Sequence, residues 1–282
     1  MLVTSKELLA DAQKHKYAVG AFNVENMEMV LAVLKAAEET KSPVIMQTTP
    51  GTVKYAGADF YFANIKAAAE RVKFPVVCHL DHGSSLAIAV QAFRAGYTSI
   101  MIDGSKLAFK ENIALTKSVA EICHAGKIPV EAELGRVGGK EDDLNNGDNN
   151  PYTDPKEAAE FVEKTGCDSL AVAVGTAHGV YKGVPQINFD VLGKIRELVD
   201  IPLVLHGTSG VPDDQVMRCV SMGMCKVNYA TDLRIAYTYG VKKYIQENPG
   251  VFDPKKYGSY GMEEVTRYVI GRMRVIGSCG RV

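Results

Sequence analysis

The chain of 282 residues has no excess of charge of either sign, because 32 Lys and Arg residues stand against 33 Asp and Glu residues. The formal net charge of −1 offers no broad positive field. We therefore expect neither nucleic acid nor an anionic membrane surface as a partner. Any recognition of a phosphate group must be local.

The sequence also lacks paired cysteines and long apolar runs. Its six cysteines never form a C-x-x-C pair, and most stand inside apolar runs such as PVVCHL and GMCKVNY. We interpret all six as buried, reduced thiols. The start, MLVTSKELLADAQKH, lacks the apolar stretch of a signal peptide, and no later segment reaches membrane-spanning length. These features predict a cytoplasmic protein.

No internal repeat, low-complexity tract or linker divides the chain, which is 46% hydrophobic. A length of this size fits one α/β-barrel domain spanning residues 1–282. One segment differs from the rest: GGKEDDLNNGDNNPYTD, residues 138–154, is polar and rich in turn formers. We expect a functional or disordered loop there.

Short apolar runs alternate with longer amphipathic stretches in eight pairs. The predicted strands cover residues 18–22, 44–48, 76–81, 99–103, 130–134, 169–175, 203–206 and 226–230. Amphipathic helices are predicted between them, among others over residues 27–40, 86–95, 112–125 and 156–165. Strands that are apolar throughout suit a parallel sheet covered on both faces. The pattern predicts a (β/α)8 TIM barrel with an extra C-terminal helix over residues 262–274; a doubly wound open sheet remains the alternative, since periodicity cannot show closure.

Every predicted strand ends in a side chain that can bind, ligate or transfer a proton. These side chains are Asn23, Thr49, Asp81, His82, Asp103, Glu133, His178, His206 and Asn228. In a barrel the carboxyl ends of all strands meet on one face, where active sites are built. His82, His178 and His206 would converge there, and three neutral imidazoles with an open fourth position suit a catalytic zinc ion.

Asp81 directly precedes His82, so it is a candidate general acid/base beside the metal. The alternative is that it only orients the histidine. His79, which alternation points the same way as Asp81, is a weaker ligand candidate, because a deeper position favours a satisfied core histidine. The segments HGTSG (206–210) and NYATDLR (228–234) follow the last two strands, where barrels commonly bind phosphate at a helix N-terminus.

The chain resembles the class II, zinc-dependent ketose-bisphosphate aldolases over essentially its whole length. The motifs that carry the resemblance are HLDHGSS (79–85), SIMIDGS (99–105), VEAELGRVGGKEDD (130–143), GTAHGVYKG (175–183), LVLHGTSG (203–210) and KVNYATDLR (226–234). Within the family it looks most like tagatose-1,6-bisphosphate aldolase, through TPGT (49–52), GTAHG and the end IGSCGRV. Fructose-bisphosphate aldolase is the alternative.

The resemblance implies a role for each matching position. Zn²⁺ would be held by His82, His178 and His206, with an alternative metal position at Asp103 and Glu133, and with Asp81 as the acid/base at the C4 oxygen. Glu141, in the polar segment, matches a mobile carboxylate that handles the carbon-bound proton. Substrate would be bound by Asn23, Thr49, Gly179, Gly207, Thr208, Ser209, Asn228, Tyr229, Ala230 and Thr231. A monovalent cation near the phosphate is also implied.

The chain departs from the family pattern at two positions. Thr208 stands where relatives usually have Gly or Ala, and Tyr229 where a smaller aliphatic residue is common. Thr208 either crowds the phosphate or points away. Neither change removes a side chain that the chemistry requires, but both bear on substrate preference.

Two other functions compete with a zinc-dependent aldolase. A Schiff-base aldolase would use Lys226, which is the only lysine inside a predicted strand. A non-catalytic sugar-phosphate-binding subunit would stabilise a partner enzyme, since tagatose-specific relatives can work with a companion subunit. Such a subunit would be expected to lose acid/base or metal residues, and all of them are present here.

The second phosphate of a bisphosphate, at C6, finds no obvious cation among the strand-end residues. The last predicted helix carries Arg272 and Arg274, and in related aldolases a basic residue from this region reaches a neighbouring subunit's site. The resemblance thus implies a homo-oligomer, a dimer or tetramer, in which Arg274, or alternatively Arg272, completes the adjacent site.

Overall fold

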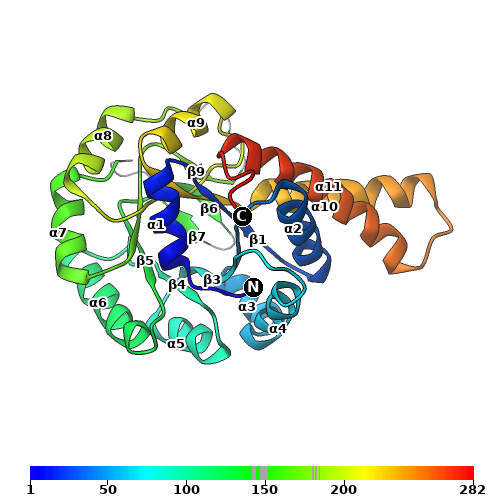
Figure 1. The fold of residues 1–282 in the computed structure, drawn as a ribbon, viewed down its shortest axis with the longest axis horizontal. Coiled ribbons are helices and arrows are strands. Elements are labelled where there is room, and N and C mark those ends of the chain that lie inside the picture. The colour runs from blue at the N-terminus through cyan, green and yellow to red at the C-terminus, as the bar shows by residue number, and fades with distance from the viewer. Residues whose placement is uncertain (142–143, 147–151, 180, 182, 184) are drawn as a thin grey trace.

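The structure is a computed structural model of the chain, and it describes residues 1–141, 144–146, 152–179, 181, 183 and 185–282. Parallel strands form a closed eight-stranded barrel (Figure 1), so the predicted TIM barrel is confirmed and the open-sheet alternative is wrong. The order around the barrel is β1-β11-β10-β8-β5-β4-β3-β2. The bounds are β1 Val19–Asn23, β2 Val44–Thr48, β3 Val76–Gly83, β4 Ser99–Ile102, β5 Val130–Leu134, β8 Ser169–Val172, β10 Leu203–Leu205 and β11 Met224–Tyr229.

Every residue of these barrel strands is buried. Alternate side chains point into the barrel and toward the surrounding helices, and both sides need apolar cover, which explains the nearly continuous apolar runs. The ring of helices in Figure 1 supplies the outer cover. It consists of α2 Met27–Thr40, α3 Pro50–Ala56, α4 Ala58–Ala69, α5 Leu86–Ala95, α6 Phe109–Ala125, α7 Pro155–Thr165, α8 Phe189–Leu198, α9 Asp213–Ser221 and α10 Thr231–Glu247.

The extra C-terminal helix is confirmed, and it is longer than the apolar pattern indicated. Helix α11 spans Pro254–Val275, and its start is set by Pro254 in the first turn and by the Asp253 carboxylate, which accepts from Lys255 N. Helices α10 and α11 pack against each other and project from the side of the barrel (Figure 1). They can approach closely because a Cβ at Gly240 would lie 2.4 Å from the Tyr260 carbonyl oxygen.

The polar segment 138–154 contains regular structure where the sequence predicted a loop. Strand β6, Gly138–Glu141, pairs antiparallel with β7, Leu144–Asn146, and parallel with β9, Ala177–His178. The expected strand 169–175 is correspondingly shorter, because β8 ends at Val172 and the chain then turns to form β9. Backbone hydrogen bonds rather than an apolar pattern define this small sheet, which explains why the sequence did not reveal it.

Helix α1, Ser5–His15, covers the amino end of the barrel. Its Leu8, Leu9 and Ala12 join a separate buried cluster with strand residues that include Val19 and Val77. The opposite end, where the strands finish, is therefore the end left for a site. Among the described residues, no helix combines the length and apolar character needed to cross a membrane.

The cysteines are all unpaired, and five of the six are buried as expected. Cys279 is exposed, so the prediction that all six are buried is wrong at this position. It follows the turn at Gly277 after α11, beyond the last apolar residue that packs on the barrel. The remaining five thiols belong to the packed interior, where burial raises the pKa of groups such as Cys123, to about 11.

Candidate metal centre and active site

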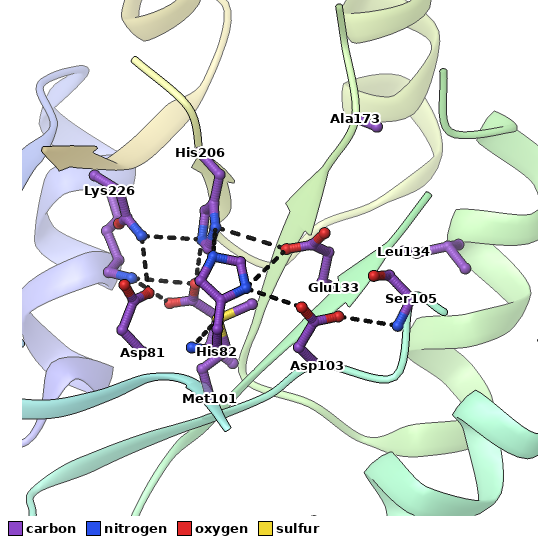
Figure 2. Close-up of polar contacts among 12 residues, drawn as sticks. Asp81, His82, Met101, Asp103, Ser105, Glu133, Leu134, Ala173, His206 and Lys226 are labelled. Atoms are coloured by element: carbon purple, nitrogen blue, oxygen red, sulfur yellow. Dashed lines mark hydrogen bonds and ion pairs between the residues drawn. The ribbon is translucent and has the colours of Figure 1, made fainter. Parts of the chain in front are cut away.

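His82 reaches the mouth of the barrel through an unusual local conformation at the end of β3. Its φ of 48° lies in the left-handed region, which non-glycine residues seldom adopt. The next residue must be Gly83, since a Cβ there would lie 2.4 Å from the Met101 carbonyl oxygen. The ring is thereby held in place, and His82 Nδ1 lies 2.9 Å from Asp103 Oδ2, at the end of β4 (Figure 2).

His82 in β3, His178 in β9 and His206, directly after β10, come together as predicted. The ring centroid of His82 is 4.9 Å from that of His178 and 4.6 Å from that of His206. One ring nitrogen of each lies within 4.8 Å of the others. His82 Nε2 and His206 Nδ1 face each other at 2.9 Å, close to the roughly 3.3 Å that tetrahedral ligands of one zinc ion would have. This donor set fits a divalent metal with an open position.

Asp103 and Glu133 form a second possible ligand group with His82, again within 4.8 Å. Glu133 Oε2 lies 3.7 Å from His82 Nδ1 and 3.6 Å from His206 Nδ1, so it stands between two imidazoles (Figure 2). Burial alone would raise the pKa of Asp103, but hydrogen bonds from His82 and Ser105 outweigh it and lower this pKa. The alternative metal position therefore has its donors in one place.

Asp81 is fully buried and held by two amides. Asn23 Nδ2 donates to Asp81 Oδ2 at 2.9 Å, and Asn228 Nδ2 donates to Asp81 Oδ1 at 3.0 Å. Gln47 in turn donates to Asn23 Oδ1 at 2.8 Å. Each carboxylate oxygen keeps further acceptor capacity, so a substrate hydroxyl can still bind. The sequence reasoning missed Gln47, whose one signal was a polar residue at an inward-facing position of the apolar strand VIMQT.

A buried ionic network lies below the histidines, inside the barrel. Lys226 Nζ is 2.8 Å from Glu131 Oε2, and Glu131 Oε1 is 2.9 Å from His206 Nε2. Burial alone would raise the pKa of Glu131, but Lys226 and the His206 contact outweigh it and lower this pKa. Glu131 thus orients His206 so that Nδ1 faces the other imidazoles. The sequence pattern predicted a site role for Glu133 in VEAEL but none for Glu131.

The network also accounts for His79 and bears on the Schiff-base alternative. His79 Nδ1 lies 2.8 Å from Ser99 Oγ and its Nε2 lies 3.4 Å from Lys226 Nζ, so it is a satisfied core histidine. Burial, together with the Lys226 charge, holds the pKa of His79 well below its usual value.

The environment of Lys226 bears on the Schiff-base alternative, since a Schiff base needs a neutral, accessible amine. Lys226 is fully buried and paired with a carboxylate, which gives that alternative no support.

A pocket beside the histidines brings together most of the predicted phosphate-binding residues. It is lined by His178, Gly179, Gly207, Thr208, Ser209, Asn228, Ala230 and Thr231. Gly207 has a φ of 64°, and a Cβ there would lie 2.7 Å from the Ala177 carbonyl group. Helix α10 begins at Thr231, so its first backbone N–H groups point toward this pocket.

The two residues that depart from the family pattern, Thr208 and Tyr229, are held by contacts with neighbouring elements. The Thr208 hydroxyl donates to the Asn228 carbonyl oxygen, so its added side chain is tied to the neighbouring strand. The Tyr229 ring stacks on Phe22, with ring centroids 5.5 Å apart, and lies between β11 and the outer helices. The Tyr229 side chain therefore does not line the pocket, and only its backbone is placed to contribute there.

The remaining predicted site residues are less central. Thr49 is buried at the start of α3, where its hydroxyl accepts from Thr52 N. Glu141 ends β6, and its side chain lies outside the described part of the structure.

The two C-terminal arginines differ in their contacts. Arg272 binds Asp213 of its own chain, at 2.6 Å. Arg274 is exposed in the last turn of α11, just before Ile276, whose carbonyl accepts from Ala18 N at the amino end of β1. Arg274 is thus remote from its own chain's site.

Three imidazoles and a buried acid at the carboxyl ends of parallel barrel strands define the class as a TIM-barrel enzyme with a site for a divalent metal. The chain belongs to the family of class II fructose-bisphosphate aldolases, which matches residues 3–281. It is thus a class II aldolase, a carbon–carbon lyase that acts on ketose phosphates, and its family implies a divalent metal.

Solved structures of similar proteins cover all or nearly all of the chain. The YdjI aldolase from Escherichia coli K12 is 39% identical, with a TM-score of 0.89, over 100% of this chain and 99% of that one. A putative fructose-1,6-bisphosphate aldolase from Coccidioides immitis is 31% identical, with a TM-score of 0.87, over 98% and 96%. Fructose-bisphosphate aldolase from Campylobacter jejuni, 23% identical with a TM-score of 0.85 over 100% and 97%, shares the fold.

Proposed function

We propose that the protein catalyses the zinc-dependent, reversible aldol cleavage of tagatose 1,6-bisphosphate to glycerone phosphate and D-glyceraldehyde 3-phosphate, as one catalytic domain. The observation that carries a metal-dependent aldol reaction is the convergence of His82, His178 and His206 beside the amide-held Asp81. The tagatose preference rests on the motifs TPGT, GTAHG and IGSCGRV. Fructose 1,6-bisphosphate is the second candidate, because the family and two of the similar structures bear that sugar's name.

In this proposal each polar group at the barrel mouth has one task. His82, His178 and His206 hold the zinc ion, which when bound supplies Lewis-acid stabilisation of the charge that develops on the ketose oxygens. Asp81 takes the proton of the C4 hydroxyl as the bond between C3 and C4 breaks, and it returns a proton in the condensation direction. Asn23 and Asn228 hold both Asp81 oxygens, so the carboxylate is positioned before substrate binds.

The phosphate of the glycerone half would bind at the pocket after β10 and β11. Gly179, Gly207 and Ser209 leave room for backbone contact, and the first turn of α10 offers N–H groups that favour an anion. A monovalent cation near this phosphate is part of the proposal. Asn23 ends β1, Thr49 follows the end of the neighbouring strand β2, and both would contact the distal half of the sugar.

Glu141 completes the proposed chemistry by giving a proton to carbon C3 of the departing glycerone phosphate. Support comes from the backbone, because β6, which ends at Glu141, pairs with β9 and so with metal-ligand candidate His178. The segment that carries Glu141 is therefore tied to the barrel mouth. A closing segment there would exclude water and complete the catalytic groups.

We further propose a homo-oligomer in which Arg274 binds the C6 phosphate in a neighbouring subunit's site. Arg274 is exposed, and Arg272 is engaged by Asp213, so Arg274 is the candidate of the two with a guanidinium exposed to a partner. A guanidinium suits a phosphate because it donates two parallel hydrogen bonds.

A coupled assay of both sugars with the purified chain alone tests the proposal. Faster cleavage of tagatose than of fructose bisphosphate is expected, and the reverse ratio would assign the enzyme to the second candidate. These sugars differ only at C4, where Asp81 and its amides act. No turnover of either sugar, with zinc bound, would instead favour the non-catalytic subunit, and recovery of activity on adding a companion subunit would establish it.

A further inference from the structure

Helix α11 contacts the start of both helices that follow the phosphate-pocket loops. Tyr268 OH donates to Asp232 Oδ2 at 2.8 Å, and Asp232 lies in the first turn of α10. One turn further along α11, Arg272 Nη1 donates to Asp213 Oδ1 at 2.6 Å, and Asp213 is the first residue of α9. The second guanidinium nitrogen, Nη2, lies 3.3 Å from Asp213 Oδ2, so this contact is a two-point charged pair.

These two contacts come from one face of α11. Tyr268 and Arg272 are spaced i, i+4, which places their side chains one above the other on a helix. The Arg272 guanidinium lies 5.5 Å from the centre of the Tyr268 ring, so each side chain limits the rotation of the other. Both side chains are partly buried against the barrel. One face of α11 therefore holds two acidic residues, each in the first turn of a helix that directly follows a pocket loop.

The same two loops form the pocket. The loop after β10 runs from His206 to Pro212, directly before Asp213, and the loop after β11 is Ala230, directly before α10. Ser209 Oγ also accepts from Asp232 N at 3.4 Å, which joins one loop to the other. Moving Asp213 or Asp232 would thus move the backbone N–H groups and small residues that line the pocket.

Helix α11 is a firm support for such contacts. It packs tightly on α10, because a Cβ at Gly261 would lie 2.6 Å from the Tyr237 ring. On its other side the Thr266 hydroxyl lies 3.3 Å from the Ala32 carbonyl oxygen of α2. A helix fixed against two neighbours can hold loop ends in one position, which is what recognition of a small anion requires.

We infer that Tyr268 and Arg272 are positioning residues for the phosphate of the glycerone half, acting from outside the barrel through Asp232 and Asp213. This pair of contacts is called the α11 clamp. The inference rests on the proposed function, since it takes the pocket after β10 and β11 as the phosphate site. In this role Arg272 acts within its own chain. This role replaces the alternative, given by the sequence analysis, that Arg272 binds the C6 phosphate in a partner subunit's site.

The test compares ligands with and without a phosphate in the zinc-loaded protein. The variants are Arg272→Met, Tyr268→Phe and the double variant, with Arg267→Met as the matched control, because Arg267 lies on the same helix with its side chain 68% exposed and paired with Glu264. Calorimetry measures binding of glycerone phosphate, and of a glycolic hydroxamate that imitates the enediolate, with and without its phosphate. Zinc content and melting temperature are measured alongside.

For Arg272→Met we expect affinity for both phosphorylated ligands to fall about tenfold, comparable to one lost charged hydrogen bond. Tyr268→Phe should have a smaller effect of the same kind, and the unphosphorylated hydroxamate, the zinc content and the control variant should be unchanged. Asp213→Asn, which keeps the shape of the contact, replaces Arg272→Met if that protein does not fold.

Three results would overturn the inference in different ways. If the variants lower the melting temperature but leave phosphate affinity unchanged, or weaken both hydroxamates equally, the clamp is only a stabilising contact. If the wild-type protein binds zinc but neither phosphorylated ligand, the proposed function itself is wrong and the clamp with it. Wild-type binding that no variant alters overturns the clamp alone.

Discussion

Lys226 and Glu131 form an ion pair inside the barrel, with Nζ 2.8 Å from Oε2 and with neither side chain more than 2% exposed. The pair lies directly below the proposed metal ligands, because Glu131 also contacts His206 Nε2 at 2.9 Å. Two buried charges are costly to desolvate, so such a pair is sensitive to the loss of either partner. Its arrangement links barrel stability to the orientation of His206, a proposed metal ligand.

Lys226→Met should destabilise the fold by about 3–5 kcal/mol, because it leaves the Glu131 carboxylate buried without its cation. Denaturant unfolding measures the change. The double variant Lys226→Met with Glu131→Gln should recover part of the loss, since it removes both charges.

Borohydride added with substrate should give no covalent adduct in the wild-type protein. A trapped adduct at Lys226 would reinstate the Schiff-base mechanism.

Metal removal should abolish activity and lower the melting temperature, because a ligand that binds only the folded state stabilises it. Exhaustive chelation followed by elemental analysis and a thermal melt provides the measurement, and zinc should restore both properties. Cobalt or iron could substitute, since geometry and availability decide which ion occupies an imidazole site. Full activity in protein shown to be free of metal is the contrary outcome.

Asp81→Ala should keep zinc and the fold but lose turnover by about 10²- to 10⁴-fold, the usual effect of removing a general acid/base. His82→Ala should lose the metal together with the activity, because it removes a ligand. The two variants share a strand and a buried position, which makes each a control for the other. Equal loss of zinc in both would reassign Asp81 to a ligating or orienting role.

The barrel could be predicted because its signal is repeated eight times. Apolar runs gave β2 and β5 to the residue, and helical spacing gave α2 and α5. The convergence of the histidines then followed from strand direction alone. The ion pair inside the barrel could not be predicted, because it depends on closure of the barrel. In the sequence Glu131 is one residue of an apolar strand, and its partner Lys226 is 95 residues further on.

Contacts outside the barrel also could not be predicted from the sequence. The sequence places Arg272 on a C-terminal helix but does not indicate its ion pair, because the partner Asp213 is 59 residues away in the chain. The small sheet of β6, β7 and β9 has no apolar alternation, so only the backbone pairing reveals it. In both cases the deciding interaction is polar and non-local, and it leaves no periodic pattern.

Glu141→Ala should slow proton exchange at the C3 carbon of glycerone phosphate more than it weakens binding of that ligand. The reason is that the carboxylate would act on a carbon-bound proton while the phosphate stays in the pocket after β10 and β11. Exchange in heavy water followed by NMR gives the rate, and calorimetry gives the affinity. Glu157→Ala, in the exposed first turn of α7, serves as a control. Unchanged exchange in the Glu141 variant would leave the segment without a catalytic role.

Arg274→Ala should raise KM for the bisphosphate while leaving glycerone phosphate binding nearly unchanged, because only the distal phosphate loses its partner. This is the reverse of the effect expected for Arg272→Met, so the choice of ligand distinguishes the roles of two arginines that stand two positions apart on one helix. Arg267→Ala again controls for loss of an exposed charge on α11. Since Arg274 lies far from its own site, the effect requires a second subunit, and ultracentrifugation should find at least a dimer at the assay concentration. A monomer with full bisphosphate activity would rule out the shared site.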